Sequence, residues 1–213
     1  MQSWLRALEA IRRASGQGQP GPTPSFSHFH VVRAIYLIAD SPGIGRKRLA
    51  EALGLGEGVA RTLLSRLKIE GLVETDRTGC FLTGKAQALY SELMARMGRP
   101  RLLEIRDTWP YPVSVGIVVK GVADLVKRGL EQRDAAIRAG AKGAMTLVYQ
   151  AGRLLMPAVS DVTAEHPEFA NKILEAMRPE EGDAIIISGA ENLHDAENGV
   201  VAAALATLGL EHI

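Results

Sequence analysis

Residues 46–84 constrain the fold more than any other part of the chain, because they combine two glycine-bounded helical patterns with a short hairpin pattern. Their sequence is RKRLAEALGLGEGVARTLLSRLKIEGLVETDRTGCFLTG. The first pattern places Leu49, Ala50 and Leu53 on one side of a helix and stops at Gly54, which is typical of a helix end. Two glycines flanking Leu55 allow a sharp reversal of the chain. The spacing therefore predicts two helices joined by a tight turn.

The second helix is predicted to begin near Gly56 or Glu57 and to have two distinct faces. At 100° per residue, its apolar residues gather on one face: Val59, Ala60, Leu63, Leu64 and Leu67. The opposite face is polar and centres on Gly58, Arg61, Thr62 and Ser65. After Gly71, two runs of β-favouring residues surround DRTG at 76–79, which predicts a hairpin with glycine in its turn.

This order of elements resembles the winged helix-turn-helix family over about residues 27–97. The resemblance rests on LAEALGLGEGVARTLLSRLKIEGLVE and on the helix start Leu82-Thr83-Gly84-Lys85 after the hairpin. It implies a module that places its second helix in the major groove of double-stranded DNA. Winged helices also serve as protein-interaction modules, so a structural role without DNA stays open.

The residues expected to contact DNA fall into two classes. Arg61 is the best candidate for reading a base, because a guanidinium can bind guanine through two hydrogen bonds, while Thr62 and Ser65 can serve a base or a phosphate. Gly58 costs about 1 kcal/mol relative to alanine in a helix, which close approach to DNA would offset. The expected phosphate contacts are Arg46, Lys47, Arg48, Arg66, Lys68 and, in the wing, Arg77.

The distribution of charge separates the two halves of the chain. The net charge is +1, but residues 1–100 hold 14 Lys and Arg against 8 Asp and Glu, whereas residues 101–213 hold 11 against 16. A basic half fits nucleic acid, and an acidic half indicates a domain that stays off the phosphate backbone. Because Cys80 is the only cysteine, the chain has no internal disulfide and no thiolate metal cage.

Localisation follows from the absence of apolar runs. No run approaches the ~20 residues that a membrane span needs. Residues 3–14 have the pattern of an amphipathic helix, which differs from that of a signal peptide. We therefore expect a cytoplasmic protein without membrane contact.

Three segments are expected: residues 1–24 as a helix followed by the Gly/Pro/Gln linker 16–24, residues 25–100 as the winged domain, and residues 101–213 as an α+β domain. The winged domain includes a helix with Ser27 as its cap and another helix over 85–97. In the last segment the patterns predict strands at 113–119, 145–149, 153–159 and 184–188, and helices at 123–139, 169–177 and 199–208. The order β-α-β-β-α-β-α indicates a mixed four-stranded sheet with helices packed against it.

The two halves together resemble an archaeal family in which a winged helix precedes an uncharacterised α/β domain. The phrases that support this resemblance are VVKGVADLVKRGLEQRDAAIRAGAKGAMTLVY, GRLLMPAVSD and GDAIIISGAENLHDAENGVVAAALATLG. The second domain also looks like the small insertion domains of some aspartyl-tRNA synthetases. Neither resemblance implies a known activity.

Motifs for catalysis, cofactors or metals are lacking in the sequence. Gly43-Ile44-Gly45-Arg46-Lys47 lacks the spacing of a phosphate-binding loop, and His28 and His30 lie two apart and so on different helix faces. We expect neither an enzyme nor a cofactor. A polar stretch at the predicted end of strand 184–188 is one candidate site for a small effector, formed by Ser188, Glu191, Asn192, His194, Asp195 and Asn198. The helical segment 128–134 is the other candidate.

Three functions compete on this basis. A DNA-binding transcription regulator with an effector-sensing or dimerising C-terminal domain accounts for the polar stripe and the charge asymmetry together. A protein- or RNA-binding adaptor would reuse the winged fold, and an enzyme would need a polar pocket that a sequence does not reveal. A homodimer is expected because helices 3–14 and 85–97 offer more apolar surface than a small winged domain covers alone.

Overall fold

A computed structural model describes residues 2–16 and 24–210, so most of the predicted linker lies outside the described residues. Its contacts divide the chain between Met94 and Ala95 into two compact units. The prediction had placed this boundary at residue 100. Among the helices that the structure describes, none combines the length and the apolar character that a membrane span requires.

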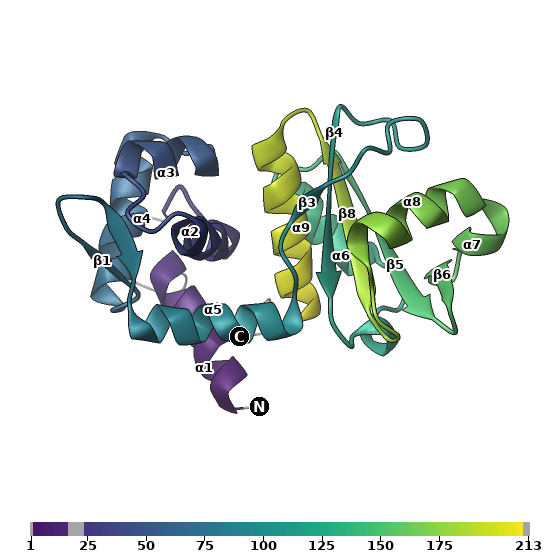
Figure 1. The fold of residues 1–213 in the computed structure, drawn as a ribbon, viewed down its shortest axis with the longest axis horizontal. Helices are drawn as coiled ribbons and strands as arrows, with labels where there is room; N and C mark the ends of the chain where they lie inside the picture. Colours follow the sequence, from purple (N-terminus) through teal and green to yellow (C-terminus); the bar gives the residue numbers. More distant parts are fainter. Residues whose placement is uncertain (1, 17–23, 211–213) are drawn as a thin grey trace. The chain divides into compact units, whose positions relative to one another are not determined.

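Unit 1 contains the predicted pair of helices and the hairpin. Its described elements are α1 (Gln2–Ser15), α2 (His28–Asp40), α3 (Arg46–Leu53), α4 (Glu57–Ile69), β1 (Val73–Thr75), β2 (Cys80–Leu82) and α5 (Gly84–Arg96) (Figure 1). The strands pair antiparallel from Val73 opposite Leu82 to Thr75 opposite Cys80. The predicted helix, turn, helix and hairpin are all present within a residue or two of their expected places.

Helix α1 belongs to the core of unit 1. It packs against α2 and α4, and its apolar face is buried: Ala7, Leu8, Ala10, Ile11 and Ala14. On α5 the buried residues within unit 1 are Ala86, Leu89 and Leu93, while Ala88 is exposed. Most of both apolar stripes is thus buried within the chain, with Leu5 of α1 left exposed, which weakens the reason for which a homodimer was expected.

Unit 2 is built around a sheet. Its described strands are β3 (Arg101–Leu102), β4 (Val113–Val119), β5 (Gly143–Gln150), β6 (Arg153–Met156), β7 (Ser160–Asp161) and β8 (Ala184–Ala190). Its described helices are the short 3₁₀ turn η1 (Ala123–Leu125), α6 (Leu130–Arg138), α7 (Val162–Glu165), α8 (Pro167–Met177) and α9 (Leu193–Thr207). The α+β class is confirmed.

The prediction of a mixed four-stranded sheet is wrong. In the described residues the sheet has six strands in the order β3-β4-β8-β5-β6-β7, and every neighbouring pair is antiparallel. Strands β4 and β5, joined through α6, run parallel to each other but are separated by β8. The β-α-β order suggested a parallel pair, because the local pattern does not show that a later strand inserts between the two.

Helices cover both faces of this sheet (Figure 1). Helix α9 packs on β4 and β8 with α6 beside it, and α8 lies against the other face over a core that includes Leu147, Ile173, Ile185 and Ile187. A strand with both faces covered is expected to be apolar throughout, and β8 is a central strand of this kind.

Two predicted helices of unit 2 have different bounds. The expected helix 123–139 is divided into η1 and α6, because Gly129 adopts a left-handed conformation before α6 begins. The expected helix 199–208 begins earlier, at Leu193, where the side chain of Asn192 caps it.

Candidate nucleic-acid interface

The turn between α3 and α4 has the geometry that the glycines predicted. Gly54 adopts a left-handed conformation with φ 69°, and the amide of Leu55 donates to the carbonyl of Ala50 at 2.9 Å. Helix α4 then starts at Glu57. The apolar faces of the two helices are buried, so the polar face of α4 is turned to solvent.

A buried arginine completes this turn, and the sequence patterns did not indicate it. Arg33 of α2 is 3% exposed, and its Nη2 donates to the carbonyl of Ala52 at 2.9 Å while Nη1 reaches that of Leu53 at 3.3 Å. A cation at the carboxyl end of a helix compensates the negative pole of its dipole. Arg33 therefore ties α2 to the end of α3. The position of Arg33 among the apolar residues of α2 was the only feature of the sequence that could have indicated this role.

The exposed face of α4 contains the predicted stripe. Gly58, Arg61, Thr62 and Ser65 are all exposed, and the Thr62 hydroxyl donates to the carbonyl of Gly58 within the same helix at 3.2 Å. At the start of α3, Arg46, Lys47 and Arg48 are exposed as well. The cationic side chains of both helices are therefore exposed to solvent and not buried in the core.

A hollow of about 380 Å³, here called the wing hollow, lies between α4, the start of α3 and the hairpin. Its cationic lining comes from Arg46, Arg61 and Lys68, and Ser65 and Thr75 add hydroxyls. Lys68 is held there because its Nζ donates to the hydroxyl of Thr75 in β1. Three cations around one concave surface suit an anion such as a phosphate group.

Cys80 forms part of this lining but is buried by its neighbours. Burial raises the pKa of the Cys80 thiol, against a weaker opposite effect of the Lys68 ammonium. The thiol is therefore neutral at physiological pH. A neutral, buried thiol is a poor nucleophile, so Cys80 acts as a packing residue.

The tip of the wing is shaped by Asp76. Its Oδ1 accepts from the Thr78 hydroxyl at 2.6 Å, from the Thr78 amide at 2.7 Å and from the Gly79 amide at 3.2 Å. These hydrogen bonds, that of the Thr78 hydroxyl first, lower the pKa of the Asp76 carboxyl. The carboxylate is thus engaged in the turn, and the neighbouring Arg77 is exposed at the tip.

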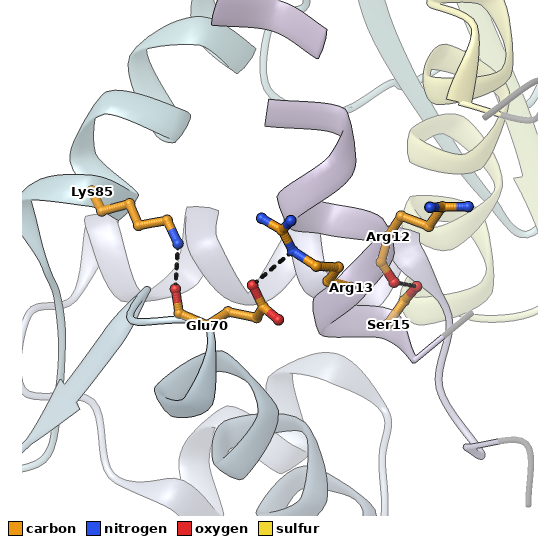
Figure 2. A network of polar contacts seen from close by, with 5 residues as sticks. All are labelled: Arg12, Arg13, Ser15, Glu70 and Lys85. Atoms are coloured by element: carbon orange, nitrogen blue, oxygen red, sulfur yellow. Dashed lines mark hydrogen bonds and ion pairs between the residues drawn. The ribbon is translucent and has the colours of Figure 1, made fainter. Parts of the chain in front are cut away.

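The carboxyl end of α4 is fastened to α1 and α5, as Figure 2 shows. Arg13 Nε lies 3.1 Å from Glu70 Oε2, and Lys85 Nζ donates to the carbonyl of Glu70 at 2.6 Å. The guanidinium of Arg66 lies against Gly16, where an added Cβ would be 2.1 Å from Nη1. Arg66, predicted as a phosphate contact, is therefore turned toward the end of α1 and away from the centre of the stripe.

A second hollow, here called the α1 hollow, lies on this side of α4. It measures about 300 Å³ and is lined by Arg13, Thr62, Ser65, Arg66, Ile69 and Glu70. Ser65 lines both hollows, so they flank the same helix face. Ile69 and Arg13 were not predicted as part of this surface. Ile69 is the last residue of α4 and lies on the polar side of this helix, as helical periodicity alone would have indicated.

The predicted effector loop in unit 2 does not exist as a loop. Strand β8 continues to Ala190 and α9 begins at Leu193, so only Glu191 and Asn192 connect them. Asn192 Oδ1 accepts from the Asp195 amide at 3.0 Å, and its Nδ2 donates to Asp195 Oδ2 at 2.8 Å. These two side chains cap the helix.

The other predicted effector residues differ in their access to solvent. Ser188 is buried, with its hydroxyl donating to the carbonyl of Ala196, and Asn198 is buried in α9. Neither can reach a ligand in solvent, so the prediction that these two residues bind an effector is wrong. Glu191 is exposed and His194 half-buried, so these two remain accessible.

Comparisons with known proteins agree with this division of the chain. Residues 30–88 match the PH0730-like N-terminal domain, and residues 112–208 match a domain of unknown function (DUF4443). The curated Central glycolytic genes regulator of Priestia megaterium (strain DSM 319 / IMG 1521) is 36% identical over 84 residues, which are 38% of this chain and 25% of the relative. The match thus spans a quarter of that regulator's length.

A solved structure matches nearly the whole chain. The hypothetical protein PH0730 from Pyrococcus horikoshii OT3 is 30% identical with a TM-score of 0.69, over 86% of this chain and 93% of that one. Both units are therefore shared with that protein, in agreement with the expected pairing of an N-terminal domain and an uncharacterised second domain. The chain belongs to the family of PH0730-like proteins.

Proposed function

We propose that the protein is a DNA-binding transcriptional regulator that reads double-stranded DNA through α4. The observation that supports this most is the exposed stripe Arg61, Thr62 and Ser65 beside the wing hollow with its cations Arg46 and Lys68. A helix in the major groove needs donors for base edges along its axis and cations for the flanking phosphates. The relative named as a regulator of central glycolytic genes supports the same class of function.

The test separates base reading from phosphate binding. Wild-type protein is used to select duplexes from a random pool at physiological salt, and the selected duplex is then titrated with variants. Arg61→Ala should cost about 1 to 3 kcal/mol and relax the preference at one base pair, because a guanidinium contact to a base edge is lost. Lys47→Ala should weaken all duplexes equally and reduce the salt dependence.

Arg66→Ala is the matched control, since it removes the same charge from the same helix on the side that faces α1. It should leave the base preference unchanged. A wild-type protein without duplex preference at any salt would contradict the proposal, and tighter binding of RNA than of duplex DNA would favour the adaptor.

For unit 2 we propose a regulatory role without catalysis, in which a small molecule alters DNA binding. The acidic charge of this half supports a domain that stays off DNA, and Glu191 and His194 remain accessible to a ligand.

Homodimerisation likewise stays a prediction. Light scattering that gives a protein mass near 22.9 kDa for the free protein, and the mass of one chain plus one duplex for the DNA complex, would contradict it.

A further inference from the structure

The last residue of α4 is an exposed isoleucine that the fold of unit 1 does not use. Ile69 is 79% exposed, more than any other large hydrophobic residue in the described parts of the chain. A β-branched residue has no conformational advantage in a helix, and here it gains no burial either. Its side chain is therefore available to a partner.

Ile69 lies on the face of α4 that contains the stripe. At 100° per residue it is within about 40° of both Thr62 and Ser65. All three residues line the α1 hollow. A molecule that lies along this face and contacts Thr62 and Ser65 can therefore also reach Ile69.

The charges around Ile69 are mixed. The α1 hollow holds the cations Arg13 and Arg66 and the carboxylate of Glu70, with which Arg13 pairs, while Lys85 donates to the backbone carbonyl of Glu70 at the carboxyl end of α4. The wing hollow on the other side of α4 has three cations and one carboxylate, that of Asp76, which the turn engages. An anion is therefore favoured on the wing side of the stripe, and an apolar group is favoured at Ile69.

We propose that Ile69 contacts the 5-methyl group of a thymine in the major groove and so specifies one base pair. This inference rests on the proposed function, because it requires that α4 lies in the groove. The thymine methyl is the apolar group that the major groove presents, and apolar side chains recognise it there. Continuity with the stripe argues for DNA over a second copy of this chain as the occupant.

The experiment uses the full chain and the duplex that the wild-type protein selects. Each thymine of that duplex is replaced in turn by deoxyuridine, which removes the methyl group and keeps every hydrogen-bonding atom. One replacement should weaken wild-type binding about fourfold, as expected for burial of one methyl-sized group. The same replacement should have no effect on Ile69→Ala. Leu5→Ala, which truncates an exposed leucine of α1, is the matched control and should retain the full deoxyuridine effect.

The outcomes separate this inference from the proposed function. If Arg61→Ala weakens binding but no deoxyuridine replacement does, DNA binding stands and the thymine contact is wrong. A deoxyuridine effect that persists in Ile69→Ala would assign the methyl contact to another residue and overturn the inference. A change in the protein's mass in Ile69→Ala with unchanged DNA affinity would assign Ile69 to a protein contact. If the wild-type protein binds all duplexes with the same affinity, the proposed function itself is overturned. Because Ile69 is exposed, the melting temperature of Ile69→Ala should match that of the wild type.

Discussion

His30 is a buried imidazole that accepts a hydrogen bond at the start of α2. The amide of Ser27 donates to its Nδ1 at 3.1 Å, and the residue is 8% exposed. Burial, the charge of Arg33 and His28 together lower the pKa of His30 from 6.5 to about 4. A protonated Nδ1 could not accept this hydrogen bond, so geometry and charge both favour the neutral form.

We expect unit 1 to lose stability as the pH falls from 6.5 to about 4. In this window the unfolded chain binds a proton at His30 that the folded chain does not, so the free energy of unfolding decreases, by up to roughly 3 kcal/mol, and it is independent of this group above pH 6.5. Denaturant titrations would follow Trp4 fluorescence in a Trp109→Phe background.

His30→Gln should reduce this pH dependence, because glutamine at this position can still accept from the Ser27 amide but does not titrate in this range. His166→Gln, at an exposed position of unit 2, is the control and should leave the dependence as in the wild type. Equal pH dependence of His30→Gln and the wild type would contradict the assignment.

Gly58 occupies the first turn of α4 with open space around the position of an added Cβ. Nothing within the protein therefore requires glycine there. Gly58→Ala should raise the stability by about 0.5 to 1 kcal/mol and lower DNA affinity, since a methyl group would obstruct close approach of the helix to DNA.

Gly84→Ala is the matched variant, because Gly84 begins α5 and also has open space around it. It should leave DNA affinity unchanged. Binding by Gly58→Ala at wild-type strength would show that DNA does not approach this turn.

At the scale of elements, the start of α9 shows why the effector loop was predicted. The stretch ENLHDAEN at 191–198 is rich in residues that favour turns and caps, and the run of small and apolar residues begins only at Gly199. The spacing of Asn192 and Asp195, three residues apart, was the available signal of a helix cap.

Asn192→Ala should destabilise unit 2 by about 1 kcal/mol, because the first turn of α9 loses its cap. The measurement is a denaturant titration followed by Trp109 in a Trp4→Phe background. Glu191→Ala removes an exposed neighbour and should have no such effect. A similar loss in both variants would mean that the cap is not its cause.

Local pattern predicted unit 1 better than unit 2 for a physical reason. The faces of α4 follow from helical periodicity alone, which is why Arg61, Thr62 and Ser65 are exposed as expected. The direction of Arg66 depends on where α1 docks, and the antiparallel sheet depends on the insertion of β8. Contacts between distant segments of this kind leave no periodic signal in the sequence.

At the scale of the whole molecule, each unit has its own core, which predicts separate responses to mutation. Leu63→Ala removes a fully buried side chain from unit 1 and should cost about 2 to 5 kcal/mol there. The unfolding transition reported by Trp4 should shift more than that reported by Trp109. Ile185→Ala in unit 2 should show the reverse, and equal shifts of both probes in either variant would contradict two separate cores.

The buried guanidinium of Arg33 separates what holds the helix pair together from what α4 presents to solvent. Arg33 donates hydrogen bonds to the carbonyls of Ala52 and Leu53 from the buried side of the turn. The exposed residues at 58, 61, 62 and 65 take no part in these hydrogen bonds. The stripe can therefore change in sequence without loss of the scaffold. If α4 reads DNA as proposed, exchange of the stripe should redirect the protein to another site while the fold is kept.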